Sequence, residues 1–277
     1  MHNIQKLSEE NIEKLNKGIK LIDETISIGK SALRKFPTKK YELEVFTFIN
    51  YLERFTFCFE NINFLLKQYQ HNPNVETGIG LMLRSSLLDL MTITYLSTYA
   101  EDDIKAKNSN NEFFNEQFNI LMTDQILNTF KYLKSVKEAE IISDSEKRKI
   151  IEQTVKDFSF LFVNEEVDYE HPESKLITNK FLSPAFIYKR ISKYPSSKNL
   201  SLVYDLYTYY SKYEHFGIMT YFLQRRGADV DFTNMITSFK YIFIGLNFTC
   251  SYLNHPTTLL DTEMQKLKHL DMEFSVL

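Results

Sequence analysis

Two polar spots on otherwise apolar helical stripes carry the side chains that could perform chemistry. Arg84 interrupts the apolar run from Ile79 to Leu96. A guanidinium on such a stripe needs a partner or a water-filled pocket, because burying an unpaired charge is costly. The second spot lies far downstream, where Ser211 and His215 stand one helical turn apart.

Four residues form the candidate site if the two segments pack side by side: Arg84, Asp89, Ser211 and His215. His215 would act as a general acid or base, since histidine has the unperturbed pKa nearest neutrality. Arg84 would hold a phosphate or carboxylate with its planar guanidinium, and Asp89 would orient either of them. The alternative is a buried hydrogen-bond network that only fixes the packing.

Other kinds of site are disfavoured by spacing. Ser211 lies within an expected helix and lacks the glycine-flanked turn that exposes a nucleophilic serine. Gly78 and Gly80 lack the later glycine and the preceding strand of a phosphate-binding loop. His269 and Glu273 are two isolated ligands, which make a poor metal site. We therefore expect no cofactor and no metal.

The elements that position these residues are expected to be long helices. Only 7 Gly and 6 Pro occur in 277 residues, so tight turns are few, and an apolar fraction of 43% can fill a large core. No repeat or Ser/Gly/Pro-rich linker divides the chain. The sequence predicts one all-α domain over residues 1–277, a bundle of about eight or nine mostly antiparallel helices.

The first expected helix begins at the capping residue Ser8 and ends before Pro37. Its apolar residues from Ile12 to Leu33 follow at steps of three and four, a seam suited to a neighbouring helix or to a homodimer. In 40–70 a strand is arguable, but length favours a helix. Further helices are expected at 75–100, 113–139, 143–161, between Pro184 and Pro195, and at 198–225, 232–254 and 258–272.

Two segments are predicted to be irregular. Residues 101–111 form a polar run, and residues 163–183 are an acidic insertion around His171 and Pro172. The spacing of the acidic residues matches no calcium or zinc pattern, so we interpret 163–183 as a solvated loop.

Charge and composition limit the function classes. A net charge of −3 and a pI of about 6.1 lack the basic footprint of a general nucleic-acid coat protein. The N-terminus has no apolar signal core, and Arg84 and Asp89 disfavour a membrane span. Cys58 and Cys250 have no metal-ligand spacing, although a disulfide stays open. A cytoplasmic protein without membrane contact is expected.

The segments Leu83–Asp89 and Tyr209–His215 resemble uncharacterised bacterial helical proteins related to the HEPN superfamily. The resemblance implies a helical bundle, often dimeric, from a toxin–antitoxin, anti-phage or RNA-processing system. Active members cleave RNA without metal, using the Arg and His of an Arg-x(4–6)-His motif. Here positions 208–210 are Thr, Tyr and Tyr, so only His215 carries over directly. The alternative is a non-enzymatic helical scaffold that binds a partner protein.

Overall fold

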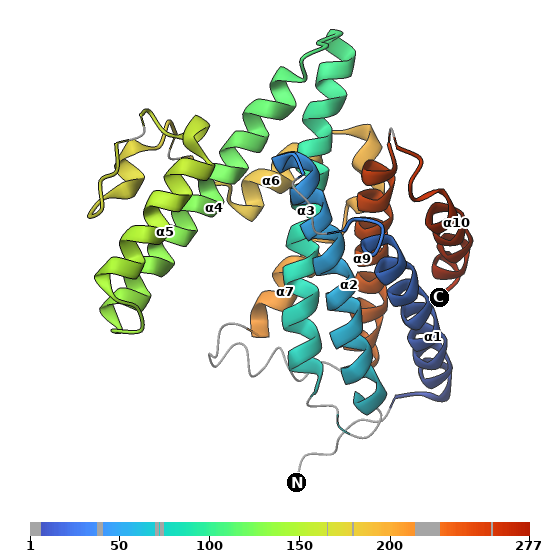
Figure 1. Ribbon diagram of the computed structural model, residues 1–277. Helices are drawn as coiled ribbons and strands as arrows, with labels where there is room; N and C mark the ends of the chain where they lie inside the picture. The colour runs from blue at the N-terminus through green and yellow to red at the C-terminus, as the bar shows by residue number, and fades with distance from the viewer. Residues whose placement is uncertain are drawn as a thin grey trace. The chain divides into compact units, whose positions relative to one another are not determined.

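The computed structural model describes residues 7–37, 41–69, 72, 75–164, 166–178, 180–213, 228–255 and 257–277 (Figure 1). In these residues the chain forms nine α-helices and four short 3₁₀ helices, and its only extended pairing is an isolated bridge between Phe162 and Leu176. The predicted all-α class is confirmed. The chain groups into two compact units: unit 1 is Met1–Ile93 with Pro195–Leu277, and unit 2 is Thr94–Tyr194.

The sequence has no linker between the two compact units, so the single domain that it predicts stays a prediction. The boundary between the units falls between Ile93 and Thr94, inside the uninterrupted helix α3 (Glu76–Ala106). A continuous helix needs no Gly, Pro or Ser to pass from one unit to the next. Composition therefore carries no sign of the boundary.

Unit 1 holds the first part of α3 and most of the long helices. They are α1 (Glu9–Leu33), α2 (Leu43–Tyr69), η4 (Pro195–Leu200), α7 (Val203–Tyr210), η5 (Ser211–Tyr213), α9 (Ala228–Asn254) and α10 (Asp261–Ser275). Glycines allow close packing of α2 with two neighbours. A Cβ on Gly29 of α1 would lie 2.3 Å from Thr56 Oγ1, and one on Gly245 of α9 would lie 2.6 Å from the Phe55 ring.

The helix prediction for α2 is confirmed, and its buried face shows why. The residues of that face follow at steps of four and three and are at most 1% exposed: Phe48, Leu52, Phe55, Phe59, Ile62 and Leu66. This is the spacing of a helical stripe, whereas a strand would bury alternate residues. The β-branched and aromatic content of the segment reflects core packing rather than a strand.

The apolar seam of α1 packs against other helices of the same chain. The Ser8 hydroxyl accepts a hydrogen bond from the Asn11 amide (3.3 Å), so the helix begins where predicted. Leu15 and Ile22 of the seam are fully buried, and α1 contacts α2, α9 and α10. A homodimer through α1 would therefore have to use another face of that helix.

Unit 2 contains the end of α3 and the shorter helices: α4 (Glu112–Glu138), α5 (Asp144–Asp157), η2 (Ser159–Leu161), η3 (Pro172–Lys175) and α6 (Pro184–Ile191). The predicted capping box opens α5, with the Ser143 hydroxyl 3.2 Å from the Glu146 amide and the Glu146 carboxylate 2.8 Å from the Ser143 amide.

The prediction that the chain becomes a polar loop at residue 101 is wrong, because α3 continues to Ala106. Arg190 of α6 explains the extension. It pairs with Asp102, donates to Thr98 Oγ1 (3.1 Å) and lies over the Tyr99 ring at 3.9 Å. Asp103 accepts the amides of the first turn of α4. These polar residues make tertiary contacts instead of contacting only solvent.

The acidic segment 163–183 is irregular in its described residues, apart from η3 and the isolated bridge. The Asp168 carboxylate accepts hydrogen bonds from the backbone amides of Glu170 (3.0 Å) and His171 (2.9 Å). At least this acidic residue of the segment therefore stabilises a local turn. In the described chain, no group of three or more His, Cys, Asp or Glu side chains is placed to hold a metal.

Helix α3 is the one described helix that is long and apolar enough to cross a membrane, with a mean hydropathy of 1.3 over its most apolar stretch. That stretch is 72% buried inside the protein. The core helix of a folded bundle has the same properties, so length and composition alone are weak signs of a membrane span.

Candidate functional site

Arg84 meets α7 and η5 inside unit 1. Its Nε donates to Ser211 Oγ at 3.0 Å and its Nη2 donates to the Tyr207 hydroxyl at 2.8 Å. The guanidinium also lies 4.6 Å from the centre of the Tyr207 ring. The structure thus brings together two of the four candidate site residues, Arg84 and Ser211, which are 127 positions apart in the sequence.

A second tyrosine ring stacks on the Tyr207 ring, on which the Arg84 guanidinium lies. The Tyr204 ring stacks on the Tyr207 ring, with centroids 6.2 Å apart and an angle of 22° between their planes. Tyr207 is buried and Tyr204 is half-buried. We call Arg84, Tyr207 and Tyr204 the Arg84 stack. A cation on an aromatic face contributes about 0.5–2 kcal/mol, depending on how far the pair is removed from water.

Residues 210–213, which we call the polar turn, bind α3 and α9 alternately. Each of its four side chains has a polar partner on one of these helices: Tyr210 with Ser238, Ser211 with Arg84, Lys212 with Asp231, and Tyr213 with Glu76. The first and third partners lie on α9, the second and fourth on α3. The turn therefore fixes Ser211 and, through it, the position of the Arg84 guanidinium.

The third of these contacts is a buried ion pair. The side chains of Lys212 and Asp231 are each 3% exposed and their charged atoms are 3.1 Å apart. Lys212 also donates to the Tyr209 hydroxyl (2.7 Å). Burial, and then the nearby Glu76 carboxylate, raises the pKa of Asp231 above its ordinary value.

Gly80 makes room for the polar turn. A Cβ on Gly80 would lie 2.4 Å from the Tyr213 ring and 3.1 Å from the Tyr210 ring. Real Cβ atoms do not approach ring carbons so closely, so only glycine lets α3 pack against these tyrosines. The glycine therefore serves packing, in agreement with the sequence argument against a phosphate loop.

Asp89 belongs to a different cluster from the Arg84 stack. Its carboxylate pairs with Arg54 of α2 at 2.9 Å, and burial raises its pKa to about 7 although Arg54 opposes the shift. Five residues along a helix correspond to a rotation of about 140°, which turns Asp89 away from the face of Arg84. Asp89, which is expected to orient Arg84 or His215, thus pairs with Arg54 instead of Arg84, and His215 lies outside the described residues.

His215, the fourth predicted site residue, lies outside the described residues. Of the residues that sequence reasoning missed, Asp231 and Glu76 are the main ones. A lysine within the aromatic run Tyr209–Tyr213 was the available signal, because a buried ammonium requires an acidic partner. Nothing in the sequence indicated which carboxylate would supply it.

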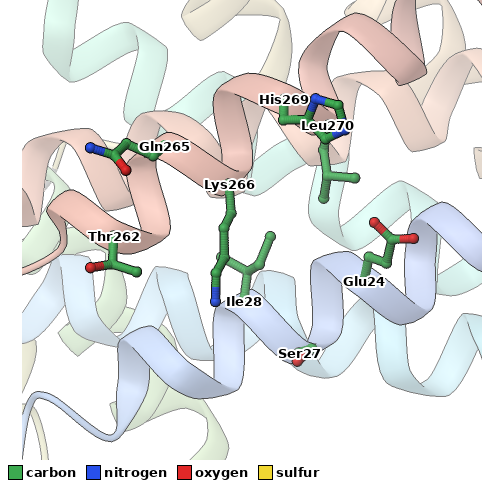
Figure 2. A pocket seen from close by; sticks show the side chains of 8 residues that line it. All are labelled: Glu24, Ser27, Ile28, Thr262, Gln265, Lys266, His269 and Leu270. Carbon is green, nitrogen blue, oxygen red and sulfur yellow. The ribbon is translucent and has the colours of Figure 1, made fainter.

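A groove of about 430 Å³ lies between α1 and α10, also in unit 1 (Figure 2). Glu24 lines it from α1, and Lys266 and His269 line it from α10. All three side chains are exposed. Glu273, one turn after His269, pairs with Lys17 at 3.4 Å.

No model of a known protein family matches the chain, and neither do curated proteins or solved structures.

Proposed function

We propose that the protein binds RNA or a nucleotide at the Arg84 stack. The observation that carries the proposal is the placement of a half-buried guanidinium on a pair of stacked tyrosines, the outer of which is half-buried. Guanidinium groups recognise phosphate through paired hydrogen bonds, and aromatic rings provide faces for bases to stack on. The two chemistries that a nucleotide needs are therefore side by side.

The low charge of the chain is compatible with a local site of this kind. With a net charge of −3, affinity for RNA would come from a few phosphate contacts and from stacking rather than from a broad basic surface. We expect a shallow dependence of affinity on salt, because each phosphate contact contributes about one unit to the slope of log affinity against log salt.

The resemblance to the HEPN superfamily extends the proposal to metal-independent RNA cleavage in a bacterial defence or toxin–antitoxin system. His215 would be the acid or base. The arginine that assists cleavage in the family motif is missing, because positions 208–210 are Thr, Tyr and Tyr. The protein could therefore bind RNA without cleaving it, so binding and cleavage are tested separately. Labelled RNA is incubated in EDTA with the wild-type protein and with His215→Ala. Cleavage that only the wild type performs supports catalysis, whereas equal or absent cleavage by both removes it.

Binding is tested by fluorescence anisotropy of a labelled single-stranded RNA. Arg84→Lys keeps the charge but loses the planar fork, and we expect affinity to fall by about tenfold or more. Arg54→Lys is the matched control, since Arg54 also lies in unit 1 but pairs with Asp89, away from the Arg84 stack. Melting temperatures of both variants check that they fold. Equal affinity of wild type and Arg84→Lys contradicts the proposal.

A non-enzymatic helical scaffold is the second candidate function, and the polar turn favours it. Each side chain of residues 210–213 has a partner on α3 or α9. Such a network holds helices in one arrangement whether or not a ligand binds. Under this alternative Arg84→Lys lowers stability without changing any affinity for RNA.

A further inference from the structure

A cavity of about 800 Å³ lies in unit 1 where α1 ends, α2 begins and α9 ends. Its size falls within the range of small-molecule sites, roughly 300–1,000 Å³. It shares no lining residue with the Arg84 stack. A ligand here would therefore be independent of the function proposed above.

Aromatic side chains form much of the cavity wall. Phe36 and Tyr41 meet edge to face, with ring centroids 6.2 Å apart. Tyr252 is stacked on the buried Phe48 ring at 3.7 Å, which fixes its orientation. Phe248 adds a fourth half-buried ring. Rings held in this way offer flat faces to an apolar body or to a cation.

The positive charge of Lys35 at the cavity is already neutralised. Its Nζ donates to Glu263 at 2.6 Å and to the Leu259 carbonyl at 2.9 Å. The Glu263 side chain is 3% exposed and also accepts from Ser31. This network links the end of α1 to the start of α10. Because the Lys35 ammonium already binds Glu263, its charge does not repel a cationic ligand strongly.

Two carboxylates at the start of α2 also line the cavity, namely Glu42 and Glu44. Neither is paired with a cation in the part of the chain that the structure describes. Burial, and then repulsion from Glu42, raises the pKa of Glu44. A cation placed between the two carboxylates would relieve this repulsion.

We propose that this cavity binds a small organic amine, with its ammonium group beside Glu44 and Glu42 and its apolar body against the rings of Tyr41 and Tyr252. Carboxylates and ring faces both attract a cation, and an anionic ligand would meet two like charges. The ligand class is set by this combination.

The test uses three probes with the same aromatic body and different charge: phenethylamine, phenethyl alcohol and phenylacetate. Binding to the full chain is measured by isothermal titration calorimetry. We expect the amine to bind about tenfold more tightly than the alcohol, and phenylacetate to bind most weakly. Equal affinities for the three probes, or no binding of any of them, overturn the proposal.

Two variants place the ligand. Glu44→Gln keeps the shape of the side chain and removes its charge, so the affinity for the amine should fall to that for the alcohol. Glu24→Gln is the control, because Glu24 lines the separate groove between α1 and α10 (Figure 2). It should leave all three affinities unchanged. A preference for the amine that survives in Glu44→Gln and in the double variant with Glu42→Gln contradicts the site.

Discussion

The ionisable residues of unit 1 show how burial, rather than residue type, decides chemical behaviour. Asp89 is 6% exposed and pairs with Arg54, whose own side chain is 55% exposed. Burial therefore outweighs the ion pair and raises the pKa of Asp89 to about 7. Cys58 nearby is buried as well, and its thiol pKa rises to about 12, which leaves it chemically inert.

A stability measurement at several pH values tests the state of Asp89. An aspartate in an unfolded chain has a pKa of about 3.9. Because the folded pKa is higher, the folded state holds a proton that the unfolded state has lost. This contribution to stability is present below about pH 4 and is lost as the pH rises through about 7.

Asp89→Asn removes the titration of Asp89. The contributions of all other carboxylates to the pH dependence of stability are the same in both proteins and cancel in the difference. The difference in unfolding free energy, variant minus wild type, should therefore increase by about 1–3 kcal/mol between pH 4 and pH 8. Urea unfolding at each pH measures it. A difference that stays level or decreases with pH would show that the pKa of Asp89 is not raised.

At the scale of elements, the helices were predictable and their extents less so. The start of α1 at Ser8 and of α5 at Ser143 follows from local capping, which the sequence encodes within four residues. The end of α3 depends on Arg190, almost ninety positions away, and the partner of Asp89 depends on how α2 packs. Contacts of this range cannot be derived from local patterns.

The packing of α3 against the polar turn gives a direct prediction. Gly80→Ala should lower the unfolding free energy by about 1–3 kcal/mol, because the added methyl group would overlap the Tyr213 ring. Gly18→Ala in α1 is the matched control. Its Cβ would meet Ile236 and Leu277 at an ordinary 3.7 Å, so better helix propensity should stabilise the protein by about 0.5–1 kcal/mol. Guanidinium unfolding of both variants measures the contrast, and equal losses would contradict it.

At the scale of the whole molecule, one contact joins distant parts of the sequence into a site. Polar residues on two apolar stripes suggested that the segments of Arg84 and Ser211 could meet, and the structure contains a hydrogen bond between these two side chains. The tyrosines that complete the Arg84 stack were visible only as a stripe at helical spacing. The stacking of Tyr207 on the Arg84 guanidinium, and of Tyr204 on Tyr207, is a property of the folded chain, and it underlies the proposed binding of RNA or a nucleotide.

Photochemical cross-linking tests this claim most directly, because it reports where a bound base lies. A single-stranded RNA carrying iodouridine is irradiated with the protein, and the cross-linked tryptic peptide is identified by mass spectrometry. The proposal predicts attachment within Asn199–Lys212, which contains Tyr204 and Tyr207. Cross-links confined to other peptides, or none at RNA concentrations that saturate binding, would contradict it.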